Sequence, residues 1–415
     1  MPQLASGKRP KDVVIDTSIF MQDPYRNRSA FKALEDLCKK GKMRLHIPRV
    51  VYEEFTSNLA DSQSQQLGNL ASALDKLSQL PNGVKHNVSK WRKTLKQKCQ
   101  EIIEHPKKEF DRWCKEVNAQ IHEIQNHHGR NVMNGYFRGH PPFKQIKSRN
   151  DIPDGFIYEA IKNIASVAEE VAVACHDDNL AKACEGIANV KIFRKLDDLI
   201  RSPEFHSLVK DQEIEKQLSR IVVALEENEE LLHEAVEDNI AEALVGKSVE
   251  HHSIPSHENE ATILSVDSPE QIEFEFGDAI YIGAGIVNIP FTCEVSAETY
   301  FHIYKADYYT LPRSRAKNIN ISEYDNDHYY EADETLDVQV HGTLAIEIDL
   351  SKMPKNVKSK TYFEQLIQDA SIQIDSIDDL TLVEPEVGMD QDEGDDDDEE
   401  DNDQSESDST QSTEY

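Results

Sequence analysis

The stretch "KDVVIDTSIF", residues 11–20, places a carboxylate directly after an apolar run. A run as apolar as residues 13–15 suits a strand that is covered on both faces of a parallel sheet. In open α/β sheets, ligands bind at the carboxyl ends of such strands. Asp16 therefore either points into a ligand site or only caps the following helix, since Asp is a preferred N-cap residue. The rest of the chain has to decide between these two interpretations.

Composition and charge limit the possible functions. The chain has 415 residues, of which 38% are hydrophobic, which predicts two or three domains together with some disordered sequence. The net charge of −33 is unevenly distributed, because residues 1–205 hold 33 Lys and Arg against 26 Asp and Glu, and the remainder holds 12 against 52. The first half can therefore meet a polyanion, whereas the second half cannot do so directly.

The same composition bears on location. No apolar run approaches the ~18 residues of a membrane span, so we expect no membrane contact. The six cysteines are scattered and form no CxxC pair. A reduced cytoplasmic protein with buried thiols is the simplest account.

Hydrophobic periodicity predicts strands alternating with helices in residues 11–55 and again in 151–205, which indicates a parallel sheet. Between them, residues 56–128 are expected to form a helical hairpin that is broken at 81–83 and is kinked or interrupted at Pro106. Residues 129–150 are rich in Gly, Pro and Asn and predict a loop. Beyond residue 261, alternating patterns such as "QIEFEF" and "LAIEIDL" predict antiparallel strands.

These patterns predict the fold and the domains. We expect a three-layer α/β parallel sheet with a helical hairpin insertion, followed by a mainly β domain and an acidic tail. The tail holds sixteen acidic residues and no basic ones, so it should be disordered in isolation. The expected parts are an extension at 1–10, the α/β domain at 11–205 with its insertion at about 56–128, an acidic helical connector at 206–260, the β domain at 261–350, a linker with a helix at 351–383, and the tail at 384–415.

Carboxylates occur at four comparable places in the α/β domain. They follow the first strand, open the helix after the second strand, precede a later helix, and follow the strand "VAVACH". Right-handed crossovers bring all four places to one edge of a parallel sheet. Crowded carboxylates repel one another, and hard divalent cations such as Mg²⁺ or Mn²⁺ relieve that repulsion. Cap preferences explain each position separately, but they do not explain why all four fall on one edge.

Four motifs carry a family resemblance. In this order, "VVIDTSIF", "IPRVVYEEF", "DIPDGFIYEAI" and "VACHDDNL" resemble the four acidic motifs of the PIN-domain nucleases, over about residues 11–200. The resemblance implies a nuclease in which Asp16, Glu54, Asp154 and Asp177 bind the metal and are catalytic. Cys175 is a departure, because the family usually has a Ser or Thr at this place. Second choices, as ligands or as their supports, are Thr17, Ser18, Glu53, Asp151 and Asp178.

A basic segment suggests the substrate. Residues 85–115 hold ten Lys and Arg against four Asp and Glu, together with the only two tryptophans, Trp91 and Trp113. We assign the charge excess to nucleic acid but expect both tryptophans to be core residues, since Trp is mostly buried. The following loop adds further cations before Asp154. The candidate nucleic-acid contacts are Arg92, Lys93, Lys96, Arg138, Lys147 and Arg149.

The resulting hypothesis is a metal-dependent endoribonuclease that hydrolyses single-stranded RNA with two divalent ions, Mg²⁺ or Mn²⁺. Two alternatives stay open, namely a non-catalytic scaffold with the same fold and a structure-specific DNA nuclease. The acidic tail is either a solvated tether or a segment that folds back on the basic helices. The β domain carries no readable motif and is a candidate site for a protein partner.

Overall fold

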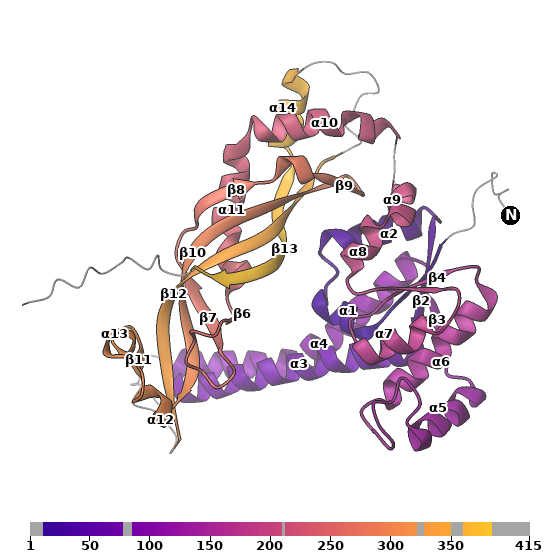
Figure 1. The fold of residues 1–415 in the computed structure, drawn as a ribbon, viewed down its shortest axis with the longest axis horizontal. Helices are drawn as coiled ribbons and strands as arrows, with labels where there is room; N and C mark the ends of the chain where they lie inside the picture. Colours follow the sequence, from indigo (N-terminus) through magenta and orange to yellow (C-terminus); the bar gives the residue numbers. More distant parts are fainter. Residues whose placement is uncertain (1–10, 78–84, 210–211, 322–327, 350–359, 384–415) are drawn as a thin grey trace, which may run out of the picture. The chain divides into compact units, whose positions relative to one another are not determined.

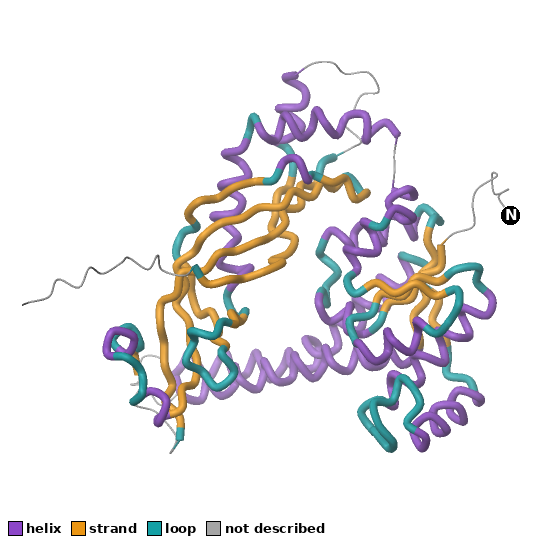
Figure 2. Tube along the Cα trace, viewed as in Figure 1, coloured by secondary structure: helices purple, strands orange, loops and turns teal. Residues whose placement is uncertain are grey.

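The computed structural model describes residues 11–77, 85–209, 212–321, 328–349 and 360–383 (Figure 1). Residues 1–382 form one compact unit. The predicted break at 81–83 and the predicted disordered tail at 384–415 lie outside the described residues. Figure 2 shows the two sheets of the described chain as separate groups of strands.

The first half contains the predicted parallel sheet. Its five strands have the order β3-β2-β1-β4-β5, and each neighbouring pair is parallel. Residues 13–15 of β1 and all of β4 are apolar and buried, because helices cover both faces of the sheet. The strands are β1 (Lys11–Ile15), β2 (Met43–Pro48), β3 (Gln120–His122), β4 (Val171–Ala174) and β5 (Val190–Phe193).

Helices form the outer two layers. The helix α2 buries Phe31, Leu34 and Leu37, which recur at helical spacing, and it packs with α8 on one face of the sheet. On the other face α6 packs with α7 (Figure 1). The predicted three-layer α/β class is confirmed. The helices are α1 (Thr17–Gln22), α2 (Ser29–Lys39), α6 (Ile152–Val167), α7 (Asp178–Glu185) and α8 (Leu196–Arg201).

The predicted hairpin is a long pair of antiparallel helices, α3 (Arg49–Leu77) and α4 (Lys85–Glu116), which we call the arm. Their direction follows from two contacts, since Tyr52 bonds Asp111 near the sheet and Asp75 pairs with Arg92 far from it. The predicted interruption at Pro106 is wrong, because α4 runs through it as one helix. Pro106 is buried in the described structure, and packing against its surroundings offsets the backbone hydrogen bond that proline cannot make.

Two elements after the arm differ from the prediction. Strand β3 lies within residues expected to be helical, and its three residues carry no apolar run that would indicate a strand. The predicted loop at 129–150 begins with a helix, α5 (Asn126–Arg138). Its Gly135 lowers helix propensity but is required by packing, because a Cβ atom there would lie 2.9 Å from a ring carbon of Phe143.

The second half contains the predicted antiparallel sheet, of eight strands. Its centre is the pair of long strands β10 (Ile286–Tyr304) and β12 (Tyr329–Glu347). The remaining strands are β6 (Ser248–Glu250), β7 (Glu260–Val266), β8 (Glu270–Phe274), β9 (Ile280–Gly283), β11 (Asn320–Ile321) and β13 (Ser371–Leu382). The helices of this half are α9 (Pro203–Val209), α10 (Gln212–Glu226), α11 (Glu229–Leu244), α12 (Lys305–Tyr308), α13 (Arg313–Ala316), α14 (Lys360–Gln368) and the 3₁₀ turn Phe276–Asp278.

Strand β13 corrects the expected linker at 351–383, because it pairs with β12 along ten positions and belongs to the sheet. It also contacts the first half. Asp375 on β13 accepts a 2.6 Å hydrogen bond from the backbone N–H of Ser29 and a second bond from its hydroxyl, and all of these groups are buried. Asn288 on β10 donates to the same hydroxyl at 3.0 Å. The first turn of α2 is therefore capped by the C-terminal sheet.

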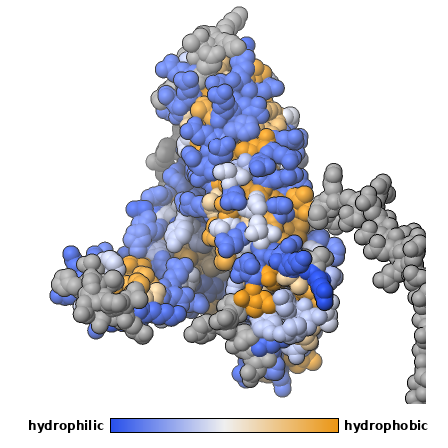
Figure 3. All heavy atoms as spheres, turned by 90° about the vertical axis from the view of Figure 1, so that its left-hand side faces the viewer, coloured by the Kyte–Doolittle hydropathy of each residue, from blue (hydrophilic) through white to orange (hydrophobic). Residues whose placement is uncertain are grey.

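On the face drawn in Figure 3, hydrophilic residues predominate and hydrophobic residues form separate patches. Scattered hydrophobic residues of this kind are normal for a protein surface. Among the described helices, none is both long and apolar enough to cross a membrane.

Candidate carboxylate site

Asp16 lies at the carboxyl end of β1 and begins α1. Its side chain accepts hydrogen bonds from the backbone N–H of Ser18 at 3.1 Å and from the Ser18 hydroxyl at 2.6 Å. The residue is 5% exposed, and burial raises the pKa of its carboxyl while the bonds from Ser18 lower it. Both interpretations of the opening stretch therefore apply to Asp16. It caps a helix, and it also lies near other carboxylates.

Glu54 lies on α3, just after β2. One of its carboxylate oxygens accepts a 2.7 Å hydrogen bond from the hydroxyl of Thr17. Thr17 is the residue after Asp16 and is 7% exposed, so this bond ties the start of α1 to α3. The bond fixes the direction in which the Glu54 carboxylate points.

Asp177 lies beyond the end of β4 and caps α7. Its Oδ1 atom accepts hydrogen bonds from the backbone N–H groups of Asn179 at 2.9 Å and Leu180 at 2.8 Å. Cys175 stands where the PIN-domain family usually has a Ser or Thr. Its thiol still donates a hydrogen bond, to the backbone carbonyl of Asp177 at 3.5 Å. The hydroxyl in this region comes instead from Ser18, which accepts the backbone N–H of His176 at 3.1 Å.

Asp154 lies in the first turn of α6. The pKa of Asp154 is raised to about 7, first by burial and then by the negative charges of Asp177, Asp16, Glu54 and Asp151, in that order. A nearby like charge disfavours ionisation, so each of these carboxylates contributes to the local negative potential. We call Asp16, Glu54, Asp154 and Asp177 the carboxylate site.

The neighbouring acidic residues are engaged elsewhere. Glu53 pairs with Arg49 at 2.5 Å and half of its side chain is exposed. Asp178 pairs with Arg194 at 2.8 Å and is 70% exposed in its side chain. Asp151 is buried and accepts the backbone N–H of Lys144 at 2.7 Å, so it anchors the loop before α6.

Arg194 is a residue that the sequence analysis missed. It follows β5, and its guanidinium donates to the backbone carbonyl of Asp177 at 3.1 Å and to that of His176 at 3.4 Å. It therefore holds the segment that carries Asp177. The available signal was its position, since it follows a predicted strand of the same parallel sheet and so lies at the same edge.

The candidate nucleic-acid contacts fall in two places. Arg92, Lys93 and Lys96 are exposed on α4, and Arg92 pairs with Asp75 of α3. Arg138, Lys147 and Arg149 are exposed on α5 and the loop that leads to α6. The expectation for the tryptophans holds for only one of them, because Trp113 is 6% exposed in the core whereas Trp91 is 50% exposed.

The residues of the carboxylate site are suited to a divalent cation. Among the described residues, no three side chains of His, Cys, Asp or Glu converge closely enough to enclose a metal ion. Mg²⁺ usually keeps several waters and is held by one or two carboxylates, so an open set of oxygen donors fits it. The raised pKa of Asp154 marks a repulsion that a bound cation would relieve.

Comparison with known families agrees with this geometry. Residues 13–179 match the family model described as PIN domain, and the match includes all four carboxylates. This part of the chain is similar to a PIN domain. Members of this family are usually nucleases, and they typically use divalent metals. The C-terminal β region is assigned to no family. Comparison with curated proteins and with solved structures gives no match.

Proposed function

We propose that the PIN domain is a metal-dependent endoribonuclease that hydrolyses phosphodiester bonds in single-stranded RNA. The observation that carries this proposal is that Asp16, Glu54 and Asp177 follow β1, β2 and β4 at the carboxyl edge of the parallel sheet, and that the charges of all three act on Asp154. Such an edge is where ligands bind in α/β sheets. RNA as the substrate is supported by the exposed cations on the arm and on the loop before α6.

Asp16, Glu54, Asp154 and Asp177 would hold Mg²⁺ or Mn²⁺. When bound, one or two such ions supply Lewis acidity, which lowers the pKa of a water and offsets charge on the phosphate. The protein groups around these carboxylates fix their directions, with Thr17 bonded to Glu54 and Ser18 bonded to Asp16. Such supporting bonds preorganise ligands for hard cations.

The test is cleavage of an end-labelled single-stranded RNA with Mn²⁺ or with EDTA. We expect metal-dependent cutting by the wild type and a loss of at least about a hundredfold for Glu54→Gln and Asp16→Asn, since each removes a charged ligand. The adjacent Glu53→Gln is the matched control, because Glu53 pairs with Arg49 rather than with the carboxylate site. It should cut at nearly the wild-type rate.

Other outcomes would change the proposal. Equal cutting by wild type and Glu54→Gln would contradict the assigned site. Mn²⁺ binding without any cutting would indicate a scaffold. Cleavage of a DNA flap in preference to RNA would indicate a structure-specific DNA nuclease.

We also propose that the acidic tail competes with RNA for the basic helices. The same cleavage assay on a chain that lacks residues 384–415 tests this proposal. Binding of a protein partner by the β domain also stays a proposal.

A further inference from the structure

The distribution of charge along the arm is unusual for this chain. The chain has 78 acidic residues, yet residues 76–100 contain seven Lys and Arg and no Asp or Glu. This stretch ends α3 and includes the distal half of α4, residues 85–100. The positive charge is therefore concentrated on the part of the arm that lies farthest from the sheet.

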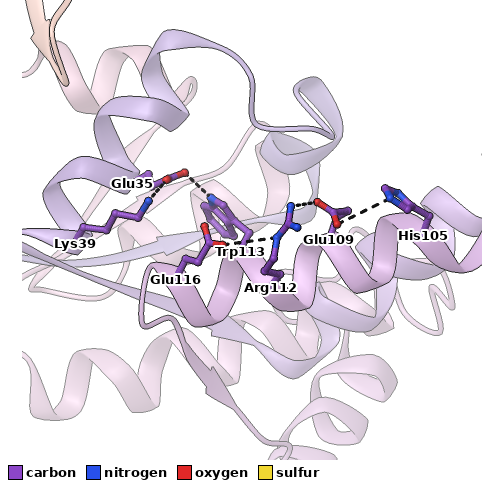
Figure 4. Close-up of polar contacts among 7 residues, drawn as sticks. All are labelled: Glu35, Lys39, His105, Glu109, Arg112, Trp113 and Glu116. Carbon is purple, nitrogen blue, oxygen red and sulfur yellow. Dashed lines mark hydrogen bonds and ion pairs between the residues drawn. The ribbon is translucent and has the colours of Figure 1, made fainter. Parts of the chain in front are cut away.

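The proximal half of α4, residues 101–116, differs because its cations are matched by acids. Arg112 lies between Glu109 and Glu116, as Figure 4 shows, and the Arg112 to Glu116 distance is 3.7 Å. Lys108 pairs with Glu104 at 3.1 Å. Such exposed pairs leave little positive potential for a ligand.

The distal half leaves cations without partners. Lys90, Lys93 and Lys96 are exposed, and their ammonium groups make no ion pair or hydrogen bond with the part of the chain that the structure describes. Residues three apart on a helix rise by about 4.5 Å per step, so the three lysines form a row along α4. A row of cations is suited to the repeating phosphates of a polynucleotide.

Trp91 follows Lys90 directly, so the two side chains leave the same turn of α4 about 100° apart, while Lys93 and Lys96 lie farther round the helix. Half of its surface is exposed, whereas Trp113 on the same helix is buried against Phe110 and bonds Glu35 of α2 at 3.1 Å (Figure 4). An exposed indole next to a cation in the sequence can stack on an unpaired base, and every base offers a flat face to it. A duplex does not offer that face, because its bases are already stacked and paired.

We propose that the distal half of α4 binds a single strand of nucleic acid, with Trp91 stacked on a base and Lys90, Lys93 and Lys96 on phosphates. This proposal rests on the proposed function and gives the nucleic-acid strand a second binding site on the protein. Asp75, which pairs with Arg92 at this end of the arm, is 21 residues beyond Glu54 on α3. At 1.5 Å per residue the second site lies about 30 Å from the carboxylate site along the helix.

The test uses tryptophan fluorescence of the full chain in EDTA, where no metal-dependent cleavage takes place. We expect a 20-mer of uridine to quench the emission of the wild type. The Trp91→Phe variant should show no such quenching, since only the buried Trp113 remains. A thymidine 20-mer distinguishes DNA from RNA as the source of the strand. Inorganic polyphosphate, which has charge but no bases, should not reproduce the quenching.

Affinity measured by anisotropy of a labelled 20-mer supplies the second readout. Trp91→Ala should weaken binding by about 5-fold to 150-fold, the range for losing one stacked base. The triple variant Lys90→Gln, Lys93→Gln, Lys96→Gln should reduce the slope of log affinity against log salt by about 2, since each phosphate contact on a single strand contributes about 0.7. The matched control removes three exposed lysines elsewhere, Lys39→Gln, Lys40→Gln and Lys191→Gln, and should leave the slope unchanged.

Three results would overturn the proposal: quenching that persists in Trp91→Phe, equal quenching by polyphosphate, or equal loss of affinity in the control triple. The binding test does not depend on catalysis. If the wild type binds the 20-mer through Trp91 but never cuts RNA, the second site stands and the proposed function fails. If RNA is cut normally by Trp91→Ala without any change in affinity, the proposed function stands and the second site fails.

Discussion

The hydroxyl of Thr17 donates a 2.7 Å hydrogen bond to the carboxylate of Glu54, which joins the residue after one proposed metal ligand to another ligand 37 positions away. Neither the strand pattern nor the helix pattern of the sequence specifies this bond. It makes the position of Glu54 depend on α1, whose first turn is held by Asp16.

We therefore expect Thr17→Val, which keeps the shape and removes the hydroxyl, to raise the Mn²⁺ concentration needed for half-maximal activity by about 10-fold to 100-fold. Calorimetric titration with Mn²⁺ measures the same change without substrate. Thr17→Ser retains a donor and is the control, so it should stay close to the wild type. An unchanged requirement in Thr17→Val would show that the bond does not orient the ligand.

The buried contact between Ser29 and Asp375 predicts a stability effect. Asp375→Ala leaves the Ser29 N–H buried without an acceptor, which should lower the free energy of unfolding by about 1–3 kcal/mol. Asp375→Asn keeps an acceptor and should cost less. Urea unfolding measures these losses, with the fluorescence of Trp113 as the signal in a Trp91→Phe background. Trp113 is a suitable probe because it packs against Phe31 of α2. Equal losses in both variants would contradict the role of the acceptor.

The same residue predicts a pH dependence. Burial raises the pKa of Asp375 above its ordinary value of 3.8, while the bonds from Ser29 and the charge of Arg28 oppose the increase and the charge of Asp23 adds to it. A raised pKa in the folded state means that the proton stabilises the fold. This contribution is complete below pH 3.8 and is lost as the pH rises through the folded pKa. As the pH rises over this range, the wild type should therefore lose stability relative to Asp375→Asn. A difference in the free energy of unfolding that does not change with pH would contradict the raised pKa of Asp375.

Cysteine reactivity offers a test of the packing. Burial raises the pKa of four thiols to about 12 and that of Cys175 further, so these five should react slowly with iodoacetamide. Cys99 on the arm is only partly buried and should react first, as mass spectrometry of briefly labelled protein would show. Early labelling of Cys38 or Cys184 would mean that the core of the PIN domain opens easily. The four thiols at about 12 are Cys38, Cys114, Cys184 and Cys293.

Packing of the C-terminal sheet is tested at Gly342 on β12. A Cβ atom there would lie 2.6 Å from a ring carbon of Phe291 and 2.9 Å from the carbonyl oxygen of Ser376. Gly342→Ala should therefore destabilise the protein by about 1–3 kcal/mol or more, measured as a lower melting temperature. Gly277→Ala is the control, because a Cβ atom there meets nothing within 4 Å. Equal melting of the two variants would argue against this packing.

The strands that precede Asp16 and Asp177 were predicted better than the elements that lie between these two residues in the sequence. Asp16 follows the apolar residues 13–15 of β1 and Asp177 lies shortly after the fully apolar β4, and such a pattern is local. The helix α5 was missed because its glycines oppose helix formation, and Gly135 is explained only by Phe143, which lies eight residues beyond it. Strand β13 was missed for a related reason. Its buried Asp375 interrupts the apolar alternation, and the group that satisfies it lies 346 positions away.

Trp91 shows the limit of reasoning from residue type. Both tryptophans lie in one amphipathic helix, and burial is the general expectation for Trp. Only the position of each along the arm decides the outcome, since Trp113 lies where α4 meets α2 and Trp91 lies where the arm has left the sheet.

The contact of Ser29 with Asp375 has a consequence for how the protein is made. A ribosome that adds about 5–20 residues per second would add Asp375 roughly 17 to 70 seconds after Ser29, given the 346 positions between them. Once Phe193 has been added, the α/β domain has all five of its strands but still lacks the acceptor for the first turn of α2. The domain made first therefore reaches its final hydrogen bonding only when nearly the whole chain has been synthesised.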